Sequence, residues 1–213
     1  ITVGNAVIDA FLTFQDHDHT IKLNKQERLL SFPYGQKIPL SSCEFLLGGN
    51  ACNVGVGLKR AGFNTALVAE LASDEFSEKI INGLKDEKVD LSQVIRHKGQ
   101  SSFSIGINFQ GERTLFVEHQ ERSHPFFFDD IKTHLIYLTS LGHTWTHVYE
   151  RIAHYVAREH ETILAFNPGS LQFMDGVGTF SFLLPLTSVL FVNKEEAEKI
   201  VNTKADTKEL LQH

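Results

Sequence analysis

Short apolar runs and amphipathic segments alternate along most of the chain. Four runs have the length and composition of buried strands: 65–71, 134–141, 162–168 and 188–193. Four segments have the spacing of amphipathic helices: 51–61, 73–89, 144–159 and 194–202. Ser73 is placed to cap the second of these helices. Because strands and helices alternate from residue 46 onward, the sequence predicts an α/β fold with a mostly parallel sheet covered on both faces.

The remaining segments predict a second, smaller β structure. Residues 1–8, ITVGNAVI, have the composition of a first buried strand. Residues 11–45 contain only short strand-like pieces separated by polar residues. Residues 101–119 alternate apolar and polar positions around a turn at Gln110-Gly111, which indicates a hairpin. We therefore expect these last two segments to form lid strands inserted in a single α/β core.

Composition and charge narrow the classes of function. Of the 213 residues, 42% are hydrophobic and 22% are charged, which is ordinary for a soluble globular domain. The net charge of −6 and the lack of a polybasic tract argue against nucleic acid or an anionic membrane surface as the main partner. No apolar run reaches the length of a membrane span. The two cysteines, Cys43 and Cys52, are too few for a disulfide framework, which favours a reduced, cytoplasmic setting.

The glycine-rich loop LLGGNACNVGVGLKRAG is the strongest candidate for a binding element. A phosphate-binding P-loop requires G-x-x-x-x-G-K-[ST], but Gly49 and Gly55 have the wrong spacing and Val56 stands where the lysine belongs. A dinucleotide-binding loop requires G-x-G-x-x-G, but Gly55-x-Gly57 continues to Arg60. The loop therefore fits neither motif.

A neutral polyol fits the loop better than an anion. Gly48 and Gly49 allow a backbone to come close to a ligand because no Cβ intervenes. Asn50 is expected to cap the following helix, and Asn53 lies in its first turn, where its carboxamide offers two donors and an acceptor. The alternative is a tight turn that only brings the helix close to a strand.

These residues resemble a known family. The stretch GGNACNVGVGLKRAGFNTALVAELASDEFSEKI is similar to the N-terminal signature of the ribokinase-like (PfkB) carbohydrate kinases, in which G-G-x-x-x-N lines the sugar pocket. Further pieces resemble the family, in its order, across almost the whole chain: VGNAVID, SSFSIGINFQGERTLF, AFNPGS and FVNKEEAEKI. The resemblance implies a ribokinase-like fold in which a β lid covers a sugar. One departure is that Ala69, Ala72 and Ser77 replace the glycines of a motif of which Asp74 is retained.

The resemblance implies a substrate-binding site with five residues: Asp9, Gly48, Gly49, Asn53 and Phe103. Asp9 would accept hydrogen bonds from two sugar hydroxyls, which suits a carboxylate that is costly to bury bare. Alternatively, Asp9 is a solvated residue at the end of its strand. Phe103, together with Phe14 and Phe32, could stack on a nucleobase or pack against the lid.

The resemblance also assigns Asn193 and Glu196 to the site of ATP and Mg²⁺, where the pair helps to hold magnesium and phosphates through water. The same spacing is that of a capping box at a helix start. Both roles are compatible, because a helix N-terminus suits anions.

Direct metal ligands are not expected. His17 and His19 would point the same way on a strand, and His143 and His147 would share a helix face. Neither pair has the glutamate of a zinc protease helix or a third convergent ligand. We interpret them as surface histidines.

The resemblance implies a phosphotransferase that moves the γ-phosphate of ATP to a hydroxyl of a sugar or sugar-like acceptor. In the family a late G-A-G-D-type motif supplies the catalytic aspartate and an anion hole, and this sequence has no such motif. We expect residues 1–213 to be an incomplete sugar-kinase core whose catalytic base lies in a missing C-terminal part. The alternatives are a non-catalytic sugar-binding or regulatory remnant, and a nucleoside kinase of the same superfamily. A homodimer formed through the lid strands is also implied.

Overall fold

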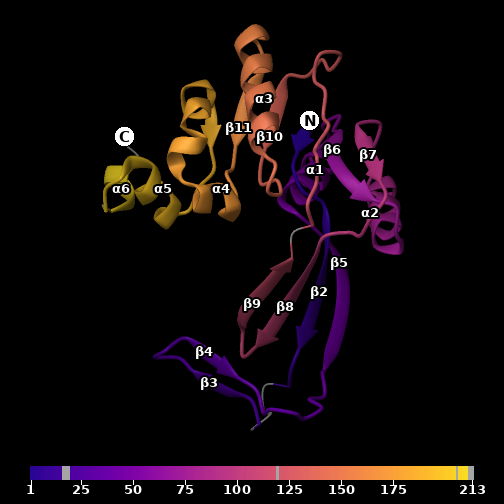
Figure 1. The fold of residues 1–213 in the computed structure, drawn as a ribbon, viewed down its shortest axis with the longest axis vertical. Coiled ribbons are helices and arrows are strands. Elements are labelled where there is room, and N and C mark those ends of the chain that lie inside the picture. The colour runs from indigo at the N-terminus through magenta and orange to yellow at the C-terminus, as the bar shows by residue number, and fades with distance from the viewer. Residues whose placement is uncertain (16–19, 119, 205, 211–213) are drawn as a thin grey trace.

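The computed structural model describes residues 1–15, 20–118, 120–204 and 206–210. These residues form an α/β core from which a narrow β lid projects, as Figure 1 shows. The core carries a six-stranded sheet and the lid a four-stranded sheet, and a two-stranded hairpin lies at the far end of the lid.

The core sheet is parallel throughout, because every pairing in it runs parallel. Its strands, in spatial order, are β12 Val189–Leu190, β11 Ile163–Phe166, β10 Leu135–Leu138, β1 Thr2–Val3, β6 Leu67–Ala72 and β7 Val94–His97. All four buried strands predicted after residue 46 belong to this sheet, which confirms the α/β fold. Strand β7 had no predicted counterpart, because its residues VIRH are largely half-buried and form no apolar run like those of the other strands.

Helices connect these strands. They are α1 Asn50–Arg60, α2 Glu75–Asp86, α3 Thr146–Arg158, α4 Ser170–Asp175, α5 Lys194–Val201 and α6 Thr207–Leu210, with the 3₁₀ helices η1 Val177–Thr179 and η2 Ser181–Leu186. All four predicted helices are present, but Asp74, and not Ser73, caps α2. The helices between residues 170 and 186 escaped prediction because none exceeds six residues. No helix in the described part of the chain is long and apolar enough to cross a membrane.

The parallel sheet separates two hydrophobic cores, because successive residues of a strand face opposite sides. On β6, Val68 belongs to the core formed with α3, whereas Leu67 and Ala69 belong to the core formed with α1 and α2. Tyr149 of α3 is fully buried and packs edge-on against Phe166 of β11, with ring centroids 5.4 Å apart. Helices therefore cover both faces of the sheet, as predicted.

The predicted first strand, 1–8, is split between the two sheets, so the prediction of a single strand is wrong. Strand β1 ends at Val3, and β2, Val7–Thr13, belongs to the lid. The turn between them packs tightly, since a Cβ on Gly4 would lie 2.6 Å from Cγ2 of Thr139. This contact with the residue after β10 accompanies the exit of the chain from the core, and no local sequence pattern reveals it.

The lid sheet has the strand order β5-β2-β8-β9, with β5 Ser42–Gly48, β8 Phe103–Phe109 and β9 Glu112–Glu118. Strand β2 pairs parallel with β8 and antiparallel with β5. The predicted turn joins β8 to β9, and Gln110 and Gly111 both have positive φ (50° and 81°), as a tight hairpin requires. The hairpin at the far end consists of β3 Lys22–Asn24 and β4 Leu29–Ser31. The first lid segment extends a few residues beyond the predicted 11–45 at each end.

Candidate acceptor site at the base of the lid

Polar side chains gather where the lid joins the carboxyl ends of the parallel strands. Strand β2 enters the lid here after β1, and α1 begins directly after β5 (Figure 1). In open α/β sheets, ligands bind outside the carboxyl ends of the strands. The predicted substrate-binding residues are therefore expected at this edge.

Asp9 lies inside a lid strand, and not at the end of one as predicted. It is the third residue of β2, in register with Leu46 of β5 and Ser104 of β8. The Ser104 hydroxyl donates a hydrogen bond to Oδ1 of Asp9. The carboxylate is half-buried and can accept further donors, because an ionised carboxylate has about four acceptor positions.

Gly48 leaves room for this carboxylate. It pairs with Val7, two residues before Asp9, and so lies on the same face of the lid sheet. An ideal Cβ on residue 48 would lie 2.7 Å from Oδ1 of Asp9 and closer still to its Cγ and Oδ2. A side chain here would push the carboxylate away from Ser104. Glycine at this position is thus a condition for the Asp9–Ser104 pair.

Gly49 is required by the backbone. It has a φ of +89°, and a Cβ there would lie 2.9 Å from the carbonyl carbon of Asn5 and 3.0 Å from Cα of Ala6. Gly49 is also the N-cap of α1 and has no side chain to satisfy the first N–H groups of the helix. The close approach expected at this glycine is thus made by the chain's own β1–β2 turn, and approach to a ligand stays a prediction.

Asn50 is not the predicted helix cap. It is the first residue of α1, and its Nδ2 lies 3.4 Å from Oγ1 of Thr139 and 3.3 Å from Oδ1 of Asn167. The Tyr137 hydroxyl also donates to Oδ1 of Asn167 (3.1 Å). Asn53 lies in the first turn of α1 as predicted, with an exposed side chain, and its role in binding stays a prediction.

Four polar residues at this edge, here called the Asn167 cluster, were only partly foreseen: Asn50, Tyr137, Thr139 and Asn167. Thr139 and Asn167 each follow directly on a buried parallel strand, and that pattern is visible in the sequence. Asn167 also donates from Nδ2 to the carbonyl of Phe191 (2.7 Å), which follows β12. Which polar residues meet depends on the strand order, and this order is not a local property.

The aromatic lid residues pack against other aromatic rings, Phe103 against the core helix α2 and Phe14 within the lid. Phe103, the first residue of β8, is half-buried, and its ring lies 5.6 Å from that of Phe76 in α2. Phe14 is 7% exposed, and its ring lies 5.4 Å from that of Phe32. Packing within the lid, one of the two roles considered, is therefore present for Phe14 and Phe32, whereas Phe103 packs against the core, and stacking on a nucleobase stays a prediction.

The thiol of Cys52 is unreactive. It lies in the first turn of α1 and is 1% exposed. Burial, reinforced by the negative charge of Asp9, raises the pKa of its thiol to about 12. The thiol is therefore protonated at neutral pH and is a poor nucleophile.

Asn193 and Glu196 form the predicted capping box at the start of α5. Oδ1 of Asn193 accepts from the Glu196 N–H (2.9 Å), and Oε2 of Glu196 accepts from the Asn193 N–H (3.0 Å). The box follows β12, at the same edge of the sheet as the Asn167 cluster. The capping bond uses only Oε2 of Glu196, and the added role toward magnesium stays a prediction.

Similarity to known proteins identifies the family. The sequence matches the pfkB family of carbohydrate kinases over residues 18–213. The chain belongs to this family. Over 63 residues, this PfkB chain is 33% identical to the 5-dehydro-2-deoxygluconokinase of Clostridium perfringens. The match covers 30% of this chain and 18% of that protein.

Two further matches cover more of the chain, one in sequence and one in fold. An uncharacterized sugar kinase of Archaeoglobus fulgidus is 27% identical over 156 residues, which is 68% of this chain and 60% of that protein. The structure of Arabidopsis thaliana ribokinase complexed with ribose and ATP matches with a TM-score of 0.73 at 16% identity, over 99% of this chain and 65% of that one. The PfkB chain thus spans less than two thirds of the length of these relatives.

Histidines do not form a metal centre in the described part of this PfkB chain, where no group of three or more His, Cys, Asp or Glu side chains is placed to hold an ion. Helix α3 begins three residues after His143, so the predicted helix face shared with His147 is wrong. Nε2 of His147 instead lies 3.0 Å from the carbonyl oxygen of His124. His17 and His19 lie outside the described residues.

Proposed function

We propose that this PfkB chain supplies the acceptor pocket and lid of a phosphotransferase, which moves the γ-phosphate of ATP to a hydroxyl of a sugar or sugar-like acceptor. The proposal depends mainly on the Asp9 carboxylate, which is held by Ser104, kept clear by Gly48 and placed beside the start of α1. Family membership supports the class of reaction, and the names of the relatives support a sugar as the acceptor.

The charge of the site favours the hydroxyl groups of an acceptor over an anionic group. A sugar presents adjacent hydroxyls, and Asp9 can accept hydrogen bonds from two of them. The amides of Asn50 and Asn53 can donate to and accept from other hydroxyls. A phosphate close to Asp9 would be repelled by the carboxylate. The glycine-rich loop is therefore proposed to bind the acceptor, and not the phosphates of the nucleotide.

The residues at the start of α5 fit ATP and Mg²⁺. When bound, ATP supplies the phosphoryl group, and Mg²⁺ neutralises the charge that develops on it. A helix N-terminus favours phosphate oxygens, and Glu196 keeps a carboxylate oxygen outside the capping bond. Because Mg²⁺ retains several of its waters, Glu196 would hold it through water. The base that accepts the proton of the attacking hydroxyl is not assigned to any of these residues.

The proposal is tested by measuring acceptor binding and ADP release with D-ribose, 5-dehydro-2-deoxygluconate and adenosine, each with ATP and Mg²⁺. We expect at least one sugar to bind saturably, and Asp9→Asn to weaken its binding about tenfold to a hundredfold, because a charged hydrogen-bond acceptor is lost. The matched control is Asp90→Asn, which removes a carboxylate from an exposed turn of the core, where Asp90 accepts from the Ser92 N–H.

Each outcome separates the alternatives. In native protein whose intact mass exceeds the 24.0 kDa of residues 1–213, sugar binding without ADP release in the presence of ATP and Mg²⁺ favours a non-catalytic sugar-binding protein. Phosphorylation of adenosine alone favours a nucleoside kinase. If Asp9→Asn binds the sugar as tightly as the wild-type chain, the assignment of Asp9 is wrong.

We also propose that two copies pair through β9, which is an edge strand of the lid sheet. All seven residues of β9 are exposed, and Leu115, Phe116 and Val117 are each more than half exposed. An unpaired edge strand with apolar side chains favours pairing with another strand. Sedimentation should show a dimer that Val117→Lys converts to a monomer. A monomeric wild-type chain at high concentration would contradict the proposal.

A further inference from the structure

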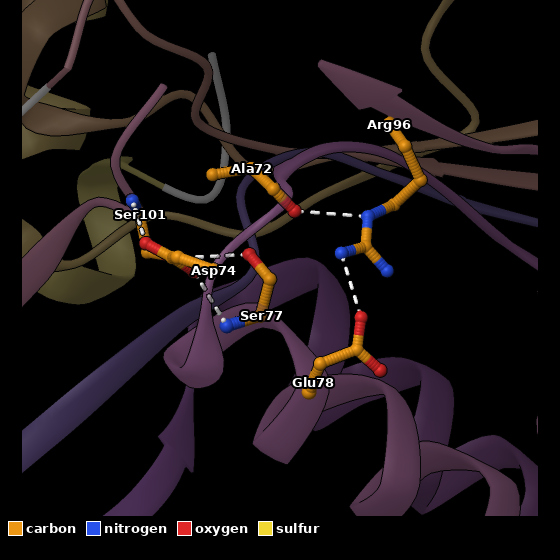
Figure 2. Close-up of polar contacts among 6 residues, drawn as sticks. All are labelled: Ala72, Asp74, Ser77, Glu78, Arg96 and Ser101. Carbon is orange, nitrogen blue, oxygen red and sulfur yellow. Dashed lines mark hydrogen bonds and ion pairs between the residues drawn. The ribbon is translucent and has the colours of Figure 1, made fainter. Parts of the chain in front are cut away.

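Residues 98–102, here called the hinge, lead into lid strand β8. The carboxylate of Asp74 accepts hydrogen bonds from the hinge. Oδ2 of Asp74 accepts from the Ser101 N–H (2.7 Å), and its Oδ1 accepts from the Ser101 hydroxyl (2.6 Å). The same Oδ1 accepts from the N–H of Ser77 in the first turn of α2 (2.9 Å). The hydroxyls of Ser77 and Ser101 lie 2.7 Å apart, and Ser77 is fully buried. Figure 2 shows the carboxylate between the hinge and the helix.

Further contacts join β6, β7 and α2 at this corner of the core. Arg96 of β7 donates from Nε to the carbonyl of Ala72 (2.9 Å) and pairs with Glu78 of α2 (2.8 Å), as Figure 2 shows. Burial opposes the ionisation of Asp74, but the hydrogen bonds from the two serines outweigh it and lower the pKa of the carboxyl to about 2. Asp74 is therefore ionised at neutral pH and able to accept all three hydrogen bonds.

The same hinge also holds the chain that returns from the lid. The Ser102 hydroxyl accepts from the Gln120 N–H (3.2 Å). Arg122 is 9% exposed and donates to the carbonyl of Gln100 (2.6 Å). Residues 98–102 thus connect α2 to both ends of the β8–β9 hairpin. Ser104, whose hydroxyl donates to the Asp9 carboxylate, comes only three residues after Ser101, which Asp74 binds.

We propose that Asp74 is a positioning residue for acceptor binding: it holds the hinge at Ser101 so that Ser104 meets the carboxylate of Asp9. The binding consequence rests on the proposed function, whereas the effect on the lid does not. The simpler alternative is that Asp74 only caps α2. A residue that is only a cap would stabilise α2 and leave the lid unaffected.

Asp74→Asn separates these two roles. Asparagine caps helices about as well as aspartate. It carries one acceptor oxygen, however, and the other branch of its side chain is an NH₂ group. With its oxygen on the Ser77 N–H, this NH₂ would face the Ser101 N–H, donor against donor. The variant therefore keeps the cap of α2 and loses the hydrogen bond from the Ser101 N–H. Asp90→Asn again serves as the matched control.

Amide hydrogen exchange of the full chain without ligand measures the hinge directly. We expect the amides of β8 and β9 to exchange about tenfold faster in Asp74→Asn, as befits the loss of a hydrogen bond to a charged acceptor. The amides of α2 should stay protected, and Asp90→Asn should match the wild-type chain. Unchanged exchange in the lid, or equal acceleration in α2 and the lid, would overturn the proposal.

A second measurement tests the consequence for binding. The dissociation constants of D-ribose and 5-dehydro-2-deoxygluconate should rise about tenfold in Asp74→Asn for whichever sugar the wild-type chain binds. An unchanged dissociation constant, with the lid loosened, would refute the positioning role. If the wild-type chain binds neither sugar, the proposed function fails for these acceptors, and the hydrogen exchange of the lid still decides whether Asp74 holds the hinge.

Discussion

Replacing Gly48 by alanine adds a single methyl group beside Asp9 and tests the geometry of the acceptor site. Gly48 has no positive φ, so alanine is compatible with its backbone. The strain falls on the side chain of Asp9, because the new Cβ would lie 2.7 Å from Oδ1 and closer still to Cγ and Oδ2. The carboxylate must rotate away, and its hydrogen bond with Ser104 is lost.

The expected loss of acceptor affinity follows from the lost Asp9–Ser104 hydrogen bond. A hydrogen bond to a charged group contributes about 1.5–3 kcal/mol, and an off-rotamer side chain costs about 1 kcal/mol. If the displaced carboxylate no longer meets the sugar hydroxyls, acceptor affinity should fall about tenfold to a hundredfold. The overall fold should persist, because β5 and β2 keep their backbone pairing.

Calorimetric titration with the sugar that the wild-type chain binds provides the assay. Gly57→Ala is the control, because a Cβ there meets nothing within 4 Å on α1. It should leave affinity unchanged and stabilise the chain by about 0.5–1 kcal/mol. The decisive comparison combines Gly48→Ala with Asp9→Ala. Once the carboxylate is gone, the added methyl group has nothing to displace, so the double variant should bind no worse than Asp9→Ala alone. Additive losses would refute the reasoning.

Three further predictions concern neighbouring groups. Burial, with nearby His147 adding to it, lowers the pKa of His124 to about 4, and this effect outweighs the Glu70 carboxylate, whose Oε2 lies 3.5 Å from Nδ1 of His124. Because the unfolded chain binds this proton near pH 6.5, stability should be constant above that pH and fall by roughly 3 kcal/mol toward pH 4. Urea unfolding at several pH values should show this slope in the wild-type chain and a much smaller one in His124→Gln. Glu196→Gln should keep the cap with Asn193 and the sugar affinity, but shift the magnesium dependence of ADP release by the complete enzyme, and an unchanged dependence would argue against the magnesium role. Asn167→Ala should lower the free energy of unfolding by about 1–3 kcal/mol, since it leaves its polar partners unpaired, and an unaltered urea midpoint would contradict this.

Local sequence patterns were sufficient for most elements and for some of the site. The β8–β9 hairpin followed from the alternation of apolar residues and from Gln110-Gly111, which tolerate positive φ. The capping box of Asn193 and Glu196 followed from spacing alone. Such features are predictable because the interacting groups lie within a few residues of one another. The ordered family motifs likewise determined the PfkB assignment, since they lie along the chain.

Only the tertiary structure decided how these elements meet. The run 1–8 has the local pattern of one strand, yet its two halves belong to different sheets. Asn50 turns toward Asn167, 117 residues away, and not to its own helix, and Ser104 meets Asp9 across 95 residues. The requirement for glycine at residue 48 likewise comes from a side chain on a neighbouring strand. Strand order and register set these contacts, and both depend on burial and pairing summed over the whole chain, which no short window of sequence contains.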